Sequence, residues 1–286
     1  MSSVLLVAHR ERADAGVLAA RAAEWLRERG RRAWLTPDDA AAVGLTELAS
    51  DEAPGVADLA VCIGGDGTML RTVHLLDGAG VPVIGVNVGL LGYLTEVEPN
   101  AMPQALERWF AGPEHGNWFL EERMMLDLAV RREGHPDRTW RALNEGVVEK
   151  QESGHTVRLQ VLIDGTPFTS YAADGLILST PTGSTAYSLS ARGPVLSPRM
   201  RAILLTPVSP HMLFDRSLVL DSSEQVEVEV LGHRAVTLSI DGQPAVSLAE
   251  GDRVAVTASE HVARFVRFGE RDFHQILKAK FGLADR

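Results

Sequence analysis

The chain has 286 residues, of which 45% are hydrophobic, so it can form packed cores in one large or two medium domains, and we expect two. Its formal net charge of −10 argues against a protein that wraps nucleic acid or lies on an anionic membrane, because both tasks need clustered positive charge. We therefore expect a small-molecule substrate, with no nucleic-acid and no membrane partner.

The cysteine content indicates the compartment. Cys62 is the only cysteine, so no intramolecular disulfide can form, and a reducing compartment is the default for such a chain. No apolar run approaches the ~18 to 20 residues that a membrane-spanning helix needs. We expect a cytoplasmic protein.

The first part of the sequence alternates apolar runs with amphipathic stretches. Residues 4–8 predict a buried strand, and the apolar spacing of residues 13–29 predicts a helix that ends before Gly30. Continuous apolar runs that end at glycines are typical of parallel strands covered on both faces. Residues 1–119 are therefore predicted to form an α/β domain with a parallel sheet. Its other expected elements are strands at 33–35, 59–63 and 81–86, and helices at 68–76 and 101–110.

The pattern changes near residue 120. Short strand-like runs, broken by Gly, Pro, Asp and Ser, predict a mostly antiparallel β domain over residues 120–269. Asp164-Gly165 and Asp241-Gly242 each lie between apolar runs and predict hairpin turns. The C-terminal segment 270–286, helical over 273–281, is expected to pack back on the first domain. The strand-like runs are 125–131, 157–163, 176–179, 202–206, 225–230, 236–240 and 253–258.

The glycine-rich segment after the strand at 59–63 is the strongest candidate for chemistry. It reads Gly64-Gly65-Asp66-Gly67-Thr68, and an apolar strand brings it to the carboxyl edge of the sheet, where open α/β folds bind ligands. Its glycines allow consecutive N–H groups to face a pyrophosphate. A carboxylate beside phosphates is costly unless it accepts a proton from an attacking hydroxyl, holds Mg²⁺, or both, which are the tasks of phosphoryl transfer. The alternative is a tight turn in which Asp66 caps a helix beginning at Thr68.

This segment matches neither the Walker pattern nor the Rossmann fingerprint. It resembles the Gly-Gly-Asp-Gly-Thr element of NAD kinases, diacylglycerol and sphingosine kinases and, with a final Ser, phosphofructokinases. The element indicates phosphoryl transfer and leaves the acceptor open.

Two later motifs indicate the acceptor. They are Asn144-Glu145 and the run of residues 174–188, which reads DGLILSTPTGSTAYS. The Asn amide can pair with a purine edge, the carboxylates accept from ribose hydroxyls or an amide, and the Ser/Thr cluster supplies short donors. Solvated loops and a surface turn are the alternative for such segments in isolation. Together they are similar to the motifs of the NAD kinase family, bacterial type, and the resemblance covers nearly the whole chain, including residues 87–93, 210–219 and 241–243.

The resemblance implies the site. Asp66 is the implied proton acceptor, Asn144 and Glu145 bind nucleoside portions, and Asp174 meets the nicotinamide side. Arg71, one helical turn beyond the loop, is a candidate for a phosphate contact, or an exposed helix residue without a role. The expected NAD contacts are Asp66, Gly67, Arg71, Asn144, Glu145, His155, Asp174, Thr185, Ala186, Tyr187, Ser188, Leu189, Ser190 and Gln243; the phosphate loop is Gly64, Gly65, Gly67 and Thr68.

The resemblance also implies the reaction and its participants. The expected activity is transfer of a phosphoryl group to the 2′-hydroxyl of the adenosine ribose of NAD, giving NADP. The donor is ATP or polyphosphate, with Mg²⁺ or another divalent metal bound mainly through phosphates and no protein metal site assigned. A homodimer or homotetramer is expected, with His211 toward a neighbouring subunit. Two alternatives stay open: a lipid kinase, and a dinucleotide-binding module without transfer activity.

Three positions depart from the family pattern. Ala172 stands where many relatives carry a basic or polar residue, Arg192 replaces the first glycine of Gly-Gly-Pro, and Ser217 stands where Pro is usual after Arg. The resemblance therefore implies no phosphate contact from position 172. None of the three positions bears on Asp66.

Overall fold

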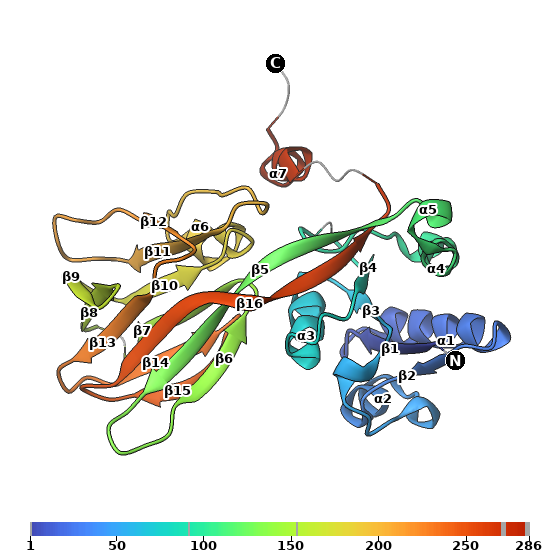
Figure 1. Cartoon of the computed structure of the whole chain (residues 1–286), viewed down its shortest axis with the longest axis horizontal. Coiled ribbons are helices and arrows are strands. Elements are labelled where there is room, and N and C mark those ends of the chain that lie inside the picture. Colours follow the sequence, from blue (N-terminus) through green and yellow to red (C-terminus); the bar gives the residue numbers. More distant parts are fainter. Residues whose placement is uncertain (1, 91, 153, 270–272, 284–286) are drawn as a thin grey trace. The chain divides into compact units, whose positions relative to one another are not determined.

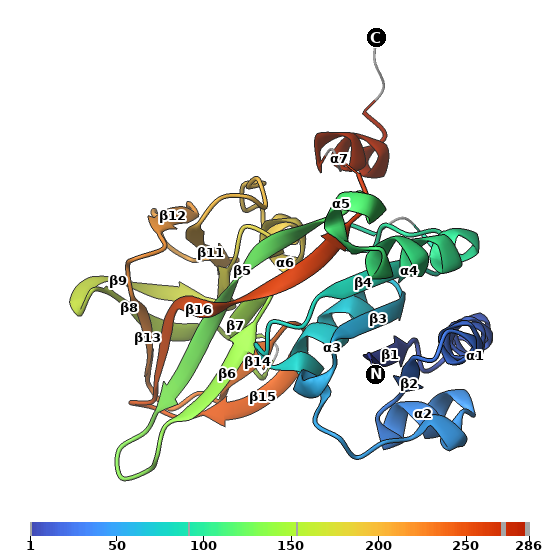
Figure 2. The same cartoon turned by 45° about the vertical axis from the view of Figure 1, so that its right-hand side comes forward.

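The computed structural model describes residues 2–90, 92–152, 154–269 and 273–283, and its contacts divide the chain into two compact units (Figures 1 and 2). Unit 1 is Met1–Glu122 with Ala263–Arg286, and unit 2 is Arg123–Val262. The division falls inside two long strands, β5 (Phe119–Arg131) and β16 (Arg253–Arg267), which pair with each other. In the described part of the chain, no helix combines the length and apolar character needed to cross a membrane.

Unit 1 alternates strands with helices. Its elements are β1 (Ser3–Ala8), α1 (Ala13–Glu28), β2 (Arg32–Trp34), α2 (Pro37–Val43), β3 (Leu59–Gly64), α3 (Asp66–Leu76), β4 (Val83–Asn87), α4 (Met102–Phe110), α5 (Gly112–Gly116) and α7 (Phe273–Phe281), with 3-10 helices at Thr46–Leu48, Pro54–Val56 and Pro99–Ala101.

The sheet of unit 1 is parallel, as the sequence predicts. Its strand order is β2-β1-β3-β4, followed by the carboxyl-terminal end of β16, and each neighbouring pair runs parallel. All six residues of β3 are buried, as expected of a central strand covered on both faces. Alanine and leucine side chains of α1 pack with residues of β1, β3 and β4 in one hydrophobic cluster. The carboxyl ends of β1, β3 and β4 therefore share one edge of the sheet.

Unit 2 is a β structure. Its elements are β6 (Arg138–Ala142), β7 (Glu145–Lys150), β8 (Val157–Ile163), β9 (Thr166–Ala173), β10 (Gly175–Ser179), α6 (Tyr187–Ser190), β11 (Ala202–Val208), β12 (Leu218–Asp221), β13 (Val226–Leu231), β14 (Val236–Ile240) and β15 (Gln243–Leu248), with a 3-10 helix at Gly183–Thr185.

The strands of unit 2 pair antiparallel, as predicted. One sheet has the order β12-β11-β10-β7-β14-β15, and a second set of strands runs β16-β13-β8-β9, with β5 beside β16 and β6 beside β5. Buried side chains from both sheets belong to one hydrophobic cluster, so they share a core. The predicted hairpins at Asp164-Gly165 and Asp241-Gly242 are confirmed, with positive φ at all four residues.

Two predictions of local structure are corrected. The helix expected at 68–76 begins at Asp66, because Gly65 is its extended N-cap residue and Gly67 continues the first turn. The second is α2, a helix absent from the predicted elements, although Thr36 caps it, Pro37 occupies its first turn and Gly44 ends it in a left-handed conformation. In the C-terminal segment, Phe273 of α7 contacts the ring of Tyr93 in unit 1; residues 270–272 and 284–286 lie outside the described residues.

Candidate active site

The glycine-rich loop of unit 1 follows directly from buried β3. Gly64 is the last residue of that strand, and a Cβ there would lie only 2.2 Å from Oγ1 of Thr68. Thr68 itself is buried in the first turn of α3, so the loop closes tightly on its own helix. The first N–H groups of a helix have no intrahelical acceptor, and they favour an anion at that end. This geometry fits a phosphate-binding loop.

The carboxylate of Asp66 is held by backbone amides. Oδ2 accepts a hydrogen bond from the N–H of Tyr93 at 2.8 Å, and Oδ1 accepts one from the N–H of Leu94 at 2.9 Å. Asp66 is the first residue of α3 and Gly65 is the N-cap residue, so the alternative in which Asp66 caps a helix beginning at Thr68 is wrong. A carboxylate has about four acceptor positions, so both oxygens retain room for a ligand. The two amides fix the orientation of the group expected to react.

Gly92 determines how closely the 92–94 segment approaches Asp66. A Cβ at Gly92 would lie 2.3 Å from Oδ1 of Asp66 and 3.0 Å from Oγ1 of Thr95. No side chain fits there without moving the carboxylate, and this close approach brings the N–H groups of Tyr93 and Leu94 into hydrogen-bonding range.

Arg71 makes contacts inside unit 1. Its Nη1 pairs with the buried carboxylate of Asp39 from α2, and its Nη2 donates to the carbonyl oxygen of Ala8 at 2.6 Å. Arg10 donates to the same Asp39 oxygen at 2.7 Å. These bonds tie α3 to the end of β1, and a phosphate contact by Arg71 stays a prediction.

In unit 2, the backbone amides of Asn144 and Glu145 are held by Asp241, while polar groups of their side chains are left for a ligand. Among the described residues, no hydrogen bond involves the side-chain amide of Asn144, and Oε2 of the buried Glu145 has no partner. Burial raises the pKa of Glu145 to about 8, with a further contribution from the charge of Asp241, while a hydrogen bond to the backbone of Tyr187 acts in the opposite direction. A buried polar atom needs a partner, which a water molecule, an ion or a ligand group can supply.

Asp174 and Tyr187 lie in the same electrostatic neighbourhood as Glu145. Asp174 pairs with Lys150 at 2.6 Å, from the neighbouring strand β7. The pKa of Tyr187 is raised first by burial and then by the charges of Glu149, Asp174 and Glu145. The structure thus brings Asp174, Glu145 and Tyr187 within electrostatic reach of one another, although they come from three separate elements.

In residues 184–190, some side chains are buried in hydrogen bonds within the protein and others are at least partly exposed. Ser184 donates to the carbonyl of Pro181 at 2.7 Å, and Ser188 shares a hydrogen bond of 2.9 Å with Thr206. Ser188 is fully buried in these contacts, and a contact to NAD from its side chain stays a prediction. The members with partly or fully exposed side chains are Thr185, Ala186, Tyr187, Leu189 and Ser190.

Three predicted residues lie on the surface. His155, His211 and Gln243 are all exposed, and Gln243 directly follows the Asp241-Gly242 turn. Contacts of His155 and Gln243 to NAD, and of His211 to another subunit, stay predictions.

Two of the three positions that depart from the family pattern have local explanations. Arg192 has a φ of 66°, in the left-handed region where glycine is favoured, which accounts for the commoner glycine. Ser217 uses its hydroxyl to share a hydrogen bond of 3.1 Å with Thr206, a contact that proline cannot make.

Sequence reasoning assigned no role to the groups that hold these residues in place. Tyr93 and Leu94 act through backbone amides, and backbone contacts of this kind have no residue-type signature. Asp241 was predicted only as part of a hairpin turn, and it is buried.

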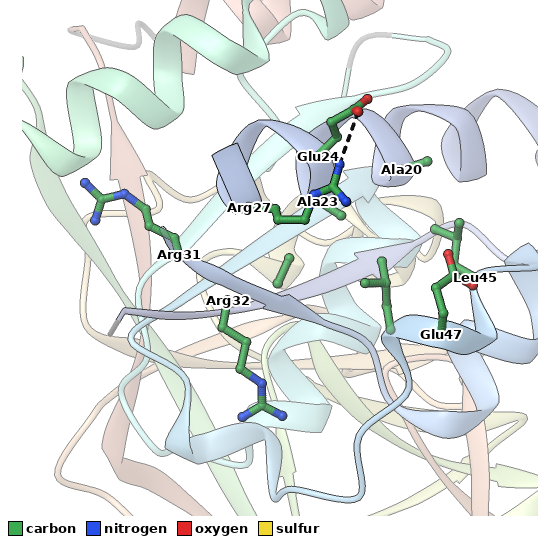
Figure 3. Close-up of a pocket in the computed structure, with 10 residues that line it drawn as sticks. Ala20, Ala23, Glu24, Arg27, Arg31, Arg32, Leu45 and Glu47 are labelled. Carbon is green, nitrogen blue, oxygen red and sulfur yellow. Dashed lines mark hydrogen bonds and ion pairs between the residues drawn. The ribbon is translucent and has the colours of Figure 1, made fainter. Parts of the chain in front are cut away.

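Two hollows on the described part of unit 1 are lined by no predicted site residue. One of about 490 Å³ lies between the second half of α1, β2 and the 3-10 helix Thr46–Leu48 (Figure 3). Arg27 on its rim pairs with Glu24, and Arg32 pairs with Glu52, so two of its cations are already engaged. A second, of about 510 Å³, lies beside the β1–α1 loop. Within the described ranges, no group of three or more His, Cys, Asp or Glu side chains is arranged to hold a metal ion.

A parallel α/β unit with this loop, joined to a β unit in which one oxygen of a buried carboxyl has no partner, is typical of two-domain phosphotransferases with a Gly-Gly-Asp-Gly-Thr element. Comparison with known proteins identifies the family. Residues 4–114 match the ATP-NAD kinase N-terminal domain, and residues 143–268 match the ATP-NAD kinase C-terminal domain. The chain belongs to the NAD kinase family.

Individual relatives cover nearly the whole chain. The NAD kinase of Heliobacterium modesticaldum is 40% identical over 98% of both chains, and that of Geobacter metallireducens is 37% identical over 92% of both. Yeast NADH kinase complexed with NADH superimposes with a TM-score of 0.86 at 25% identity, covering 100% of this chain and 89% of the yeast chain. The NAD kinase from Archaeoglobus fulgidus in complex with ATP has the same fold, with a TM-score of 0.72 at 23% identity and coverage of 99% and 98%.

Proposed function

We propose that this chain phosphorylates NAD on the 2′-hydroxyl of the adenosine ribose and produces NADP. The observation that carries the proposal is the carboxylate of Asp66, held by two backbone amides on the glycine-rich loop of a chain that belongs to the NAD kinase family.

Asp66 is the proposed proton acceptor. Its oxygens are oriented by the N–H groups of Tyr93 and Leu94 and retain acceptor positions for the proton of the attacking hydroxyl. The N–H groups at the start of α3 stabilise charge on the transferred phosphoryl group. Catalysis in this proposal rests mainly on positioning and electrostatics, as phosphoryl transfer requires.

Unit 2 supplies the proposed recognition of the dinucleotide. Asn144 offers an amide to a purine edge, Glu145 and Asp174 offer carboxyl groups to ribose hydroxyls or the nicotinamide amide, and Tyr187 belongs to the same neighbourhood. Residues 185–190 line the base pockets in this proposal, and His155, Gln243 and Arg71 are peripheral candidates.

The donor is proposed to be ATP, with inorganic polyphosphate as the alternative to be tested. A divalent metal such as Mg²⁺ fits the residues present, because Mg²⁺ is typically bound by one or two carboxylates together with substrate phosphates, and Asp66 is one carboxylate with acceptor positions available. When bound, such an ion neutralises charge on the phosphates. All other stabilisation in the proposal comes from Asp66 and the amides of the loop.

A homodimer or homotetramer in the cytoplasm completes the proposal. The buried free thiol of Cys62 is compatible with a reducing compartment. The mass in solution, measured by light scattering, distinguishes a monomer from a dimer or tetramer.

The decisive experiment replaces Asp66. We expect Asp66→Asn to lower kcat for NADP formation by at least about a hundredfold, the lower end for loss of a general base, while NAD binding measured by calorimetry persists. Asp58→Asn is the matched control, because Asp58 lies at the opposite end of β3 and also accepts a backbone amide, that of Ser3 at 2.8 Å. The control should retain wild-type kcat.

Wild-type turnover by Asp66→Asn would refute the assignment of the proton acceptor. The wild-type chain should be assayed with NAD and NADH as acceptors, each with ATP and with polyphosphate. If NAD binds and no donor yields NADP, the chain is a binding module and the proposed activity is wrong.

A further inference from the structure

The two Asp-Gly hairpin turns of unit 2 share a backbone conformation and differ in what their carboxylates do. Asp164 and Gly165 have φ values of 50° and 74°, and Asp241 and Gly242 have 46° and 81°. Asp164 is exposed, and its carboxylate accepts one nearby amide, that of Gln225 at 2.9 Å. Asp241 is only 8% exposed, so the turn conformation alone does not explain its burial.

The buried carboxylate of Asp241 accepts three consecutive backbone amides. Oδ2 accepts from the N–H of Leu143 at 2.8 Å, and Oδ1 accepts from Asn144 at 2.8 Å and Glu145 at 2.9 Å, across 96 to 98 positions of sequence. The N–H of Asp241 also donates to the carbonyl of Glu145 at 2.9 Å. Burial of a charge is costly unless hydrogen bonds replace its contacts with water, and the three amides supply such bonds to the Asp241 carboxylate.

The carbonyl side of the same segment is fixed as well. Thr180 donates through its hydroxyl to the carbonyl of Leu143 at 2.6 Å and through its N–H to the carbonyl of Asn144 at 2.8 Å. A Cβ at Gly183 would lie 2.2 Å from that Asn144 oxygen, so the following turn packs directly on the segment. The backbone of residues 143–145 is therefore fixed on both sides, while the amide of Asn144 and Oε2 of Glu145 lack protein partners among the described residues.

We propose that Asp241 is a positioning residue for NAD recognition, whose carboxylate orders residues 143–145 so that the side chains of Asn144 and Glu145 are presented to the dinucleotide. This inference rests on the proposed function, since it takes NAD as the ligand of these two side chains. Asp241 itself touches backbone groups and acts through its neighbours.

The charge of Asp241 adds a pH-dependent signature. Burial is the main cause that raises the pKa of Glu145, and the negative charge of Asp241 raises it further. Other groups near this site are Tyr187 on α6, whose backbone hydrogen bond lowers the pKa of Glu145, Glu149 on β7, and the pair of Lys150 on β7 with Asp174 between β9 and β10. Removal of the Asp241 charge therefore lowers the pKa of Glu145.

The test compares Asp241→Asn with Asp164→Asn in the full-length chain. The Asn side chain keeps one acceptor oxygen and places an NH₂ group against amides that also donate, so the 143–145 segment loses order. For Asp241→Asn we expect the KM and Kd for NAD to rise at least about tenfold while kcat changes less than about threefold, as for a loss of ground-state binding. The pH at which NAD affinity changes should move to lower values. Asp164→Asn should leave all of these at wild-type values.

Several outcomes would overturn the inference. Unchanged NAD affinity in folded Asp241→Asn would do so, as would a uniform loss of activity with unchanged KM and pH profile, since that pattern marks a purely structural role. Hydrogen exchange on the wild-type chain needs no variant: the amides of Leu143, Asn144 and Glu145 should exchange as slowly as core strand amides, and fast exchange would contradict the proposed ordering. Calorimetry with NAD keeps the tests separate, because a wild-type chain that binds NAD without turnover refutes the proposed activity alone.

Discussion

Gly92→Ala tests whether the orientation of Asp66 controls turnover. The new Cβ would lie 2.3 Å from Oδ1 of Asp66 and 2.9 Å from its Cγ. Ordinary contact begins near 3.4 Å, so the carboxylate must retreat by about 1 Å, a displacement of a reacting group that can lower the rate by about a hundredfold. The shift also weakens the bonds from Tyr93 and Leu94, each of which contributes about 1 kcal/mol.

The expected result is a fall in kcat of about 10- to 100-fold, with the Kd for NAD changed far less, because the proposed nucleoside contacts lie in unit 2. Steady-state NADP formation and calorimetry measure the two quantities, and thermal unfolding should show only a small loss of stability. Gly269→Ala is the control, since a Cβ there meets no atom within 4 Å and its backbone is outside the left-handed region. If the kcat of Gly92→Ala is within twofold of wild type, the close packing of residues 92–94 against Asp66 is not needed for turnover, and the argument is refuted.

Three further predictions concern stability and reactivity. Arg192→Gly should raise the free energy of unfolding by up to about 1 kcal/mol, because relief of the left-handed conformation exceeds the entropy cost of glycine; a lower denaturation midpoint would contradict this. The pKa of Glu145 is 4.5 in the unfolded chain and about 8 in the folded chain, so between these pH values the folded chain holds the proton more tightly. The free energy of unfolding should therefore fall as pH rises through this window, by at most about 1.4 kcal/mol per pH unit. Glu145→Gln should flatten that slope in pH-dependent denaturation. Burial raises the pKa of Cys62 to about 12, so iodoacetamide at pH 8 should label it only after unfolding, and rapid labelling of the native chain would show that the thiol is accessible.

The strands β1 and β3 of unit 1 were predictable because each is a continuous apolar run. β1 and β3 lie within one residue of the predicted bounds at each end. The start of α3 was placed two residues late, since Gly-Asp-Gly favours a loop by local propensity, whereas the tertiary bonds to Asp66 allow the helix to include it. α2 had capping signals in Thr36 and Gly44 and was missed because its apolar face is short.

The long strands were harder to predict. The sequence indicated strands only at 125–131 and 253–258, whereas β5 spans Phe119–Arg131 and β16 spans Arg253–Arg267. Their extensions carry charged residues that sequence patterns assign to the surface. In the structure, Arg267 is 1% exposed and pairs with Glu121 at 2.6 Å, so a charge pair fills positions where apolar residues are expected.

The motif at Asp66 also predicts only part of what the structure shows. The motif around Asp66 identifies a candidate reacting group from local sequence, while its orientation depends on the carbonyl and amide of Leu94. Arg267 donates to that carbonyl at 2.9 Å, and Leu94 in turn donates its N–H to Asp66. Arg267 thus links β16 to Asp66 through the backbone of one residue, Leu94, which lies 173 positions from Arg267 in sequence, and no local pattern encodes this contact. The identity of the reacting group is a local property of this sequence, and its geometry is a property of the fold.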